Sequence, residues 1–238
     1  MEEVEGKKVM RDSTSVIHVY LETGSQRTFA GAIDWPGWCR SGRDEASALG
    51  ALLDYGPRYA RVLGAARIGF RAPADLSALI VTERLKGNAS TDFGAPAVVP
   101  TNDARPIGDI EVRRFQAILK ASWRSFDKAT KAAKGKKLRK GPRGGGRALC
   151  EIIHHVLEAD GAYLGRLGWT SKWSEKGDAP ERLRQVRQVI LKALKSASYT
   201  DPPSIGPRGG VRWKAPYFVR RVAWHVLDHA WEIEDRMM

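Results

Sequence analysis

Two histidines four residues apart near the C-terminus are the side chains best suited to chemistry. Apolar residues at spacings of three and four predict one amphipathic helix over residues 216–236. His225 and His229 then leave this helix on the same side, at the border of its apolar stripe. Neutral imidazoles one turn apart can bind a common divalent metal ion. The alternative is a pair of ordinary histidines at a surface boundary.

A third histidine, His155, is expected on the same border of a second helix. Apolar residues between 149 and 167 define that helix, and at 100° per residue His155 falls at its border while His154 faces away. Three imidazoles with open coordination positions suit a catalytic zinc site, although iron or nickel accept the same ligands. Three unrelated boundary histidines are the alternative. Small neighbours leave room for a pocket on this edge: Ala148, Ala159 and Ala162.

Two more helices are expected to position these histidines. The helical period begins at residue 109, and Asp178–Glu181 supplies an N-cap, a first-turn proline and an acid at N3 for another helix. Four helices of similar length, each with one apolar stripe, predict a four-helix bundle over residues 105–238. Trp224 and Trp231 project from the last helix away from its stripe. We expect them to contact the N-terminal domain, with a homodimer interface as the second option.

The N-terminal part has the pattern of a small α+β domain, which we assign to residues 14–104. A helix is expected over 44–63, with Pro57 ending or kinking its first part. Residues 87–106 contain three prolines and are expected to form an irregular connector up to a domain boundary near 105. Alternating apolar and β-branched residues predict strands over 16–22, 28–33 and 79–85, the first two as a hairpin, and a short extra strand is an option within 34–42.

One stretch of this domain resembles a known family. The run Asp34-Trp-Pro-Gly-Trp-Cys39, followed by Gly42 and by Asp44-Glu-Ala46, is similar to the signature of HicB-like antitoxin domains. In that signature an Asp-Leu-Pro-Gly-Cys stretch leads into a Gly-x-Thr-x-Glu-Glu-Ala helix start. The resemblance covers about residues 16–56 and implies a small α+β fold. It does not imply repressor activity, because we find no DNA-binding segment of the ribbon-helix-helix or helix-turn-helix kind in the sequence.

The C-terminal part resembles the DinB-like superfamily. The resemblance covers roughly residues 109–236 and lies in two segments, His-Val-Leu-Glu-Ala-Asp-Gly-Ala-Tyr-Leu (155–164) and His-Val-Leu-Asp-His-Ala-Trp-Glu-Ile-Glu (225–234). It implies a four-helix bundle that binds a divalent metal through one histidine of the second helix and a histidine pair of the fourth. Several members are similar to transferases or isomerases that use low-molecular-weight thiols such as bacillithiol or mycothiol. The implied metal ligands are His155, His225 and His229.

A basic, glycine-rich segment precedes each histidine-bearing helix. Gly141-Pro-Arg-Gly-Gly-Gly-Arg147 is echoed by Gly206-Pro-Arg-Gly-Gly-Val-Arg212. Backbone amides at such helix entries favour anions, so Arg143 and Arg208 are candidate anion-binding residues, with coincidence as the alternative. Residues 128–147 carry nine cations and no acid, which permits contact with a phosphate backbone. Nucleic acid is not favoured, because no aromatic residue in this stretch is present to stack on bases.

The composition is that of a globular protein, and its positive charge permits an anionic partner: nucleic acid, an acidic membrane surface or a small acid. Its net charge is +13, with 42% hydrophobic and 28% charged residues. No run approaches about 18 apolar residues, so we expect no contact with a membrane. The acidic start does not have the pattern of a signal peptide. Cys39 and Cys150 lie far apart and are expected to be reduced thiols, which favours a cytoplasmic location.

Two functions are compatible with these patterns. The first is a metal-dependent S-transferase or hydrolase, in which zinc activates a thiol or water towards a small electrophilic or acidic substrate. Glu158 and Asp228 lie one turn from a histidine and are candidates to orient a ligand or act as a base. The second is a non-catalytic binding module, in which the HicB-like domain and the basic loop contact a protein or a nucleic acid. The predicted fold is an α+β HicB-like domain followed by an all-α DinB-like four-helix bundle.

Overall fold

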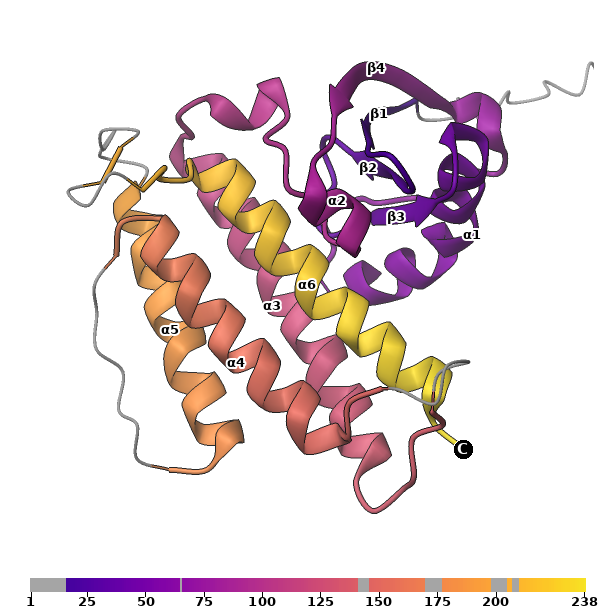
Figure 1. The fold of residues 1–238 in the computed structure, drawn as a ribbon. Coiled ribbons are helices and arrows are strands. Elements are labelled where there is room, and N and C mark those ends of the chain that lie inside the picture. Colours follow the sequence, from indigo (N-terminus) through magenta and orange to yellow (C-terminus); the bar gives the residue numbers. More distant parts are fainter. Residues whose placement is uncertain (1–15, 65, 141–145, 170–176, 198–204, 207–209) are drawn as a thin grey trace, which may run out of the picture.

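The computed structural model describes residues 16–64, 66–140, 146–169, 177–197, 205–206 and 210–238. The protein is of mixed α+β type, with a four-stranded sheet in its N-terminal part followed by long helices (Figure 1). None of the helices described combines the length and the apolar character needed to cross a membrane.

The sheet contains β1 (Ile17–Thr23), β2 (Thr28–Ala32), β3 (Cys39–Gly42) and β4 (Leu79–Lys86). Its strand order is β3-β2-β1-β4. β1 and β2 form the predicted antiparallel hairpin, and β3 adds to the free edge of β2. β4 returns through α1 (Glu45–Gly64) to pair in parallel with β1. The strands expected from the alternation of apolar residues are therefore confirmed, including the optional short one.

Two expectations for the N-terminal part need correction. Of the two options for Pro57, the end of a helix is wrong: α1 continues through Pro57 because buried residues on both sides, Leu52 and Tyr59, hold the helix in place. The connector after β4 is not irregular throughout, because it contains the short helix α2 (Ala89–Phe93) and the 3₁₀ turn η2 (Thr101–Ala104).

The buried carboxylate of Glu22 organises this connector from a distance in the sequence. It accepts hydrogen bonds from the Thr91 hydroxyl at 2.5 Å and from the backbone amides of Ala97 and Val98. Asn88 caps α2, with reciprocal hydrogen bonds to Thr91. The connector has no regular pattern of apolar residues, and Glu22 of β1 therefore helps to hold it in one conformation.

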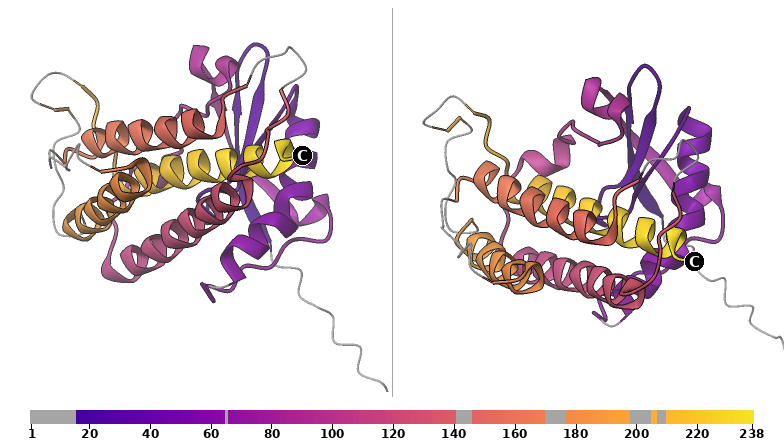
Figure 2. Two further views of the ribbon diagram at one scale, coloured as in Figure 1. Left: turned by 90° about the horizontal axis from the view of Figure 1, so that it is seen from below. Right: turned by 60° about the horizontal axis from the view of Figure 1, so that its bottom comes forward.

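The four predicted long helices are confirmed as α3 (Asp109–Ala133), α4 (Leu149–Arg166), α5 (Ala179–Ala197) and α6 (Ala215–Arg236). They pack side by side into a bundle, with α6 between α3 and α4, and α5 against α4 and α3 (Figure 2). α4 and α6 are antiparallel, since Arg236 at the end of α6 donates to the carbonyl of Arg147 just before α4. At the other end, the amide of Trp213 donates to the carbonyl of Arg166.

α6 is a helix of the bundle that also packs against the N-terminal part. Every residue from Ala215 to Leu227 is buried. Trp224 contacts Phe29 of β2 edge-on, with ring centroids 6.2 Å apart, and Trp231 contacts Tyr55 of α1 at 5.0 Å. The expected contact of both tryptophans with the N-terminal part is therefore confirmed. One continuous hydrophobic core includes residues of the sheet, of α1 and of the bundle.

Candidate metal centre

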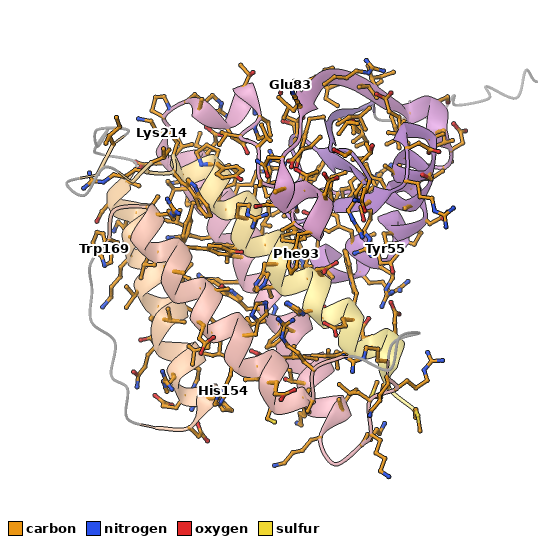
Figure 3. All side chains as sticks on the ribbon, viewed as in Figure 1. Tyr55, Glu83, Phe93, His154, Trp169 and Lys214 are labelled. Atoms are coloured by element: carbon orange, nitrogen blue, oxygen red, sulfur yellow. The ribbon has the colours of Figure 1, made fainter. Side chains whose placement is uncertain are left out.

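His155 of α4 meets His225 and His229 of α6 at one point between the two helices. One ligand nitrogen from each ring can be chosen so that all three lie within 4.8 Å of one another. Nε2 of His225 lies 3.1 Å from Nε2 of His155, and the three ring centroids are 4.7–5.0 Å apart. The convergence predicted from helical position is thus found in the fold, whereas His154, directly before His155 on α4, is exposed (Figure 3).

His229 is held by a carboxylate one turn further along α6. Nδ1 of His229 lies 2.7 Å from Oε2 of Glu232, whose other oxygen pairs with Arg236. Burial alone would raise the pKa of Glu232, but the hydrogen bonds and charges of His229 and Arg236 outweigh it and lower the pKa. The ionised carboxylate can only accept, so the hydrogen of the ring lies on Nδ1. Nε2 is then left with a free lone pair for a metal ion.

His225 is the most strongly perturbed of the three rings. It is 7% exposed, and burial first, then the charges of His229 and His155, lower its pKa well below the usual value. Its Nδ1 has no hydrogen-bond partner among the described residues. The ring is instead oriented by packing against Tyr163 and Trp224, with centroids 5.8 Å and 6.0 Å away. Such a ring stays neutral at physiological pH, which is the form that binds metals.

His155 connects the cluster to solvent. It is half-buried and lines an open pocket of about 360 Å³. Burial and then the positive charge of Arg147 lower the pKa of His155, so this ring also favours its neutral form. The other residues of this pocket come from α4 and from the residue before its cap: Arg147, Cys150, Glu151, His154 and Glu158.

The donor set fits a divalent transition metal. Two nitrogens bound to one tetrahedral zinc at about 2.0–2.1 Å lie roughly 3.3–3.4 Å apart, close to the 3.1 Å between His155 and His225. The widest separation in the cluster, at most 4.8 Å, slightly exceeds twice a zinc–nitrogen bond of about 2.1 Å. Small ring rotations would therefore bring all three nitrogens to one ion. Three imidazoles do not by themselves distinguish zinc from nickel or iron.

The other predicted site residues are placed differently. Glu158 is exposed in the pocket beside His155. Asp228 accepts a hydrogen bond from Arg40 of β3 at 2.9 Å, so its carboxylate is engaged with the N-terminal part. Arg143 and Arg208 lie outside the described residues, and their role in anion binding stays a prediction. The described residues that flank them lie at opposite ends of the antiparallel α4–α6 pair.

Three residues of the site were missed from the sequence. Glu232 and Arg236 support His229, and the spacing of three between His229 and Glu232 was a usable signal, because such pairs share a helix face. Arg147 was assigned to the basic segment only, although it acts electrostatically on both His155 and His225. Its position depends on the path of the chain between α3 and α4, which periodicity does not reveal.

Comparison with protein-family models, curated proteins and solved structures finds no match to this chain. The site is therefore interpreted from its own geometry and chemistry. What these establish is a cluster of three histidines that could hold a metal ion, beside a pocket open to solvent.

Proposed function

We propose that this protein is a divalent-metal-dependent enzyme of the DinB-like type, with zinc as the first choice of metal. The observation that carries the proposal is the cluster of His155, His225 and His229, whose ligand nitrogens lie within 4.8 Å of one another. The contact between His229 and Glu232 adds support, because metal-binding histidines usually donate their second ring nitrogen to a carboxylate or carbonyl. The resemblance of the C-terminal sequence to DinB-like proteins points to the same three ligands.

The residues around the cluster have distinct roles in this proposal. A bound divalent ion would supply Lewis acidity, which favours the ionised form of a thiol or a water molecule at neutral pH. Glu232 keeps His229 in the tautomer that presents Nε2, and Arg236 holds Glu232 in place. Burial of His225 excludes water from the inner side of the cluster. Glu158, in the outer pocket, is the carboxylate available to accept a proton from a substrate there.

The pocket beside His155 suggests the substrate class. Arg147 lies at its edge and can pair with the carboxylate of a small acidic substrate. Its open side admits a small molecule without rearrangement of the helices. A low-molecular-weight thiol as the transferred group rests on the DinB-like resemblance. We therefore propose transfer of such a thiol to a small electrophilic or acidic substrate.

Metal content tests this function directly. We expect the purified protein, reconstituted with zinc and desalted, to retain about one ion per chain in elemental analysis. The double variant His225→Ala/His229→Ala should retain none, because two of three ligands are gone. His154→Ala is the matched control, since this exposed histidine lies beside His155 and should leave the metal content unchanged. A wild-type protein without metal, or a double variant with undiminished metal, would contradict the proposal.

Replacing Glu232 with glutamine is expected to weaken zinc binding by about 10–100-fold. The amide retains the shape of the side chain but loses the charge that fixes the His229 ring and favours the cation. The affinity can be measured by competition with a chromophoric chelator at pH 7. Glu234→Gln is the control, because Glu234 pairs with Arg58 on another side of α6 and should bind zinc normally. Equal zinc affinities for Glu232→Gln and the wild type would show that Glu232 does not support zinc binding.

A specific observation also supports the second function, that of a binding module. The chain between α3 and α4 exposes a series of cations in its described part, and its sequence contains no acid to neutralise them. Such a surface binds polyanions through release of counterions. This alternative predicts metal-free protein that retains a single-stranded or double-stranded nucleic acid at low salt and releases it steeply as salt rises. Stoichiometric metal without such retention would exclude it.

A further inference from the structure

Another pocket lies where α1, α3 and α6 meet, and we call it the α1–α3 pocket. Its volume is about 260 Å³, and among the described residues it shares no lining side chain with the pocket beside His155. Glu234 of α6 is the one acid among its described lining residues. Its basic lining residues come from α1 and from α3: Arg58, Arg61, Arg124 and Lys128. This excess of positive charge makes the α1–α3 pocket a candidate site for an anion.

The acid of the pocket is already paired. Glu234 accepts a hydrogen bond from Nη2 of Arg58 at 2.7 Å, and the two oxygens of Asp235 accept from Nη1 of Arg58 at 2.9 Å and 3.0 Å. Arg58 is therefore neutralised within the protein. The other basic side chains of the pocket form no ion pair or hydrogen bond in the part of the chain that the structure describes: Arg61, Arg124 and Lys128.

These three cations are arranged unfavourably unless an anion is bound. Arg124 and Lys128 lie one turn apart on α3, and like charges at this spacing destabilise a helix. Arg61 of α1 adds a third positive charge to the same pocket. All three residues are exposed, so a ligand that enters from solvent reaches their charged groups without rearrangement of the helices.

Apolar residues form the buried part of the lining. Val62, Ala121 and Trp231 line the pocket, and Ala121 and Trp231 are 1% and 3% exposed. Because these residues keep water away from one side of the pocket, the charges in it are screened less than on an open surface. Ser125 of α3 also lines the pocket, and its hydroxyl has no hydrogen-bond partner among the described residues. It adds a neutral donor to the cations.

A phosphate monoester matches this set of donors better than a carboxylate does. It carries close to two negative charges at neutral pH, and its three terminal oxygens are strong acceptors, so it can pair with cations of two helices at once. A carboxylate has one charge on two oxygens and is matched by a single guanidinium. The volume of about 260 Å³ is smaller than the roughly 300–1,000 Å³ of pockets for drug-sized ligands, which favours a phosphate with a short body.

We propose that the α1–α3 pocket binds the phosphate group of a small phosphate monoester. Arg61, Arg124 and Lys128 pair with the phosphate oxygens, and the hydroxyl of Ser125 donates a hydrogen bond to one of them. The ligand thereby connects α1 of the N-terminal part with α3 of the bundle. This site is separate from the histidine cluster and does not depend on the metal.

Titration calorimetry with glycerol 3-phosphate at constant low ionic strength tests the proposal on the full chain. We expect saturable binding of one molecule per chain, and roughly tenfold weaker binding of glycerate, which has a similar body but a carboxylate. Arg61→Gln and Arg124→Gln should each weaken glycerol 3-phosphate by about tenfold, the lower end of the range for a hydrogen bond between charged groups. Loss in both variants places the ligand between α1 and α3.

Arg113→Gln is the matched control. It makes the same change of charge at an exposed position of α3 outside the pocket, and it should bind glycerol 3-phosphate as the wild type does. The three variants replace exposed side chains and should keep the circular dichroism of the wild type. Absence of saturable binding to the wild type, or equal losses in Arg113→Gln and Arg124→Gln, overturns the proposal.

A nucleic acid is the other carrier of phosphate groups, and a single-stranded oligonucleotide distinguishes the two. We expect the oligonucleotide to bind equally to Arg113→Gln and Arg124→Gln, because a polyanion responds to the charge of the whole surface. Oligonucleotide binding that is lost only in Arg61→Gln and Arg124→Gln, without binding of glycerol 3-phosphate, would overturn the proposal in favour of a nucleic-acid backbone.

Discussion

Replacing Arg220 with methionine is expected to lower the free energy of unfolding by about 3–5 kcal/mol. Arg220 of α6 forms a buried ion pair with Asp103 of η2, with the two side chains 5% and 1% exposed. It also donates to the carbonyls of Ala32 and Ile33 at the end of β2, at 2.7 Å each. Methionine would leave Asp103 as a buried charge without its counterion and two carbonyls without their donor. Urea unfolding at pH 7 measures the loss.

Two comparisons make this prediction specific. Arg84→Met removes an arginine whose pair with Glu45 is exposed, and it should change stability little because water screens such pairs. Arg220→Met/Asp103→Leu removes both charges and should recover part of the loss, since the unpaired carboxylate disappears. If Arg220→Met unfolds at the urea concentration of Arg84→Met, the ion pair does not hold α6 to the sheet and η2.

The histidine cluster could be predicted because helical period fixes the side of a helix on which a residue lies. His225 and His229 share a side by their spacing, and His155 was assigned to the matching border of its own helix. What the sequence could not show is the depth of the site. Periodicity indicated a boundary position, whereas His225 is 7% exposed because its ring packs against His155 and Tyr163 of α4.

Buried charges explain why α6 was only partly understood from its sequence. Its polar residues indicated a helix with one solvent face, yet Arg220 and Arg221 are buried. Arg220 is buried because Asp103, 117 residues away, neutralises it. Arg221 donates to the carbonyl of Pro96 and to the hydroxyl of Tyr163. Partners this distant in the sequence leave no periodic signal. The sequence pattern of α6 therefore does not distinguish an arginine that is buried in an ion pair from one that is exposed to solvent.

Asp160→Asn is expected to change how the stability of the protein depends on pH. Asp160 is fully buried on α4, and neither oxygen has a hydrogen-bond partner among the described residues. Burial raises the pKa of this carboxyl to about 7, and the positive charge of Arg187 offsets only part of the effect. An unfolded chain releases the same proton near pH 3.9.

The direction of the effect follows from proton binding. Between about pH 4 and pH 7 the folded protein retains a proton that the unfolded chain has lost, so wild-type stability falls as the pH rises through this window. Asparagine stays neutral at every pH and does not have this dependence. The free energy of unfolding of Asp160→Asn, relative to the wild type, should therefore rise between pH 4 and pH 8. The upper bound of this rise is roughly 4 kcal/mol, for about three pKa units.

Urea unfolding of both proteins at intervals from pH 4 to pH 8 tests this prediction. Taking the difference between the two proteins cancels the titration of the histidines and the other carboxylates, provided that their surroundings are unchanged. Asp54→Asn on α1 is the control, because it makes the same chemical change at an exposed position. Parallel profiles for Asp160→Asn and the wild type would mean that Asp160 is already ionised in the fold, with water or an ion as its partner.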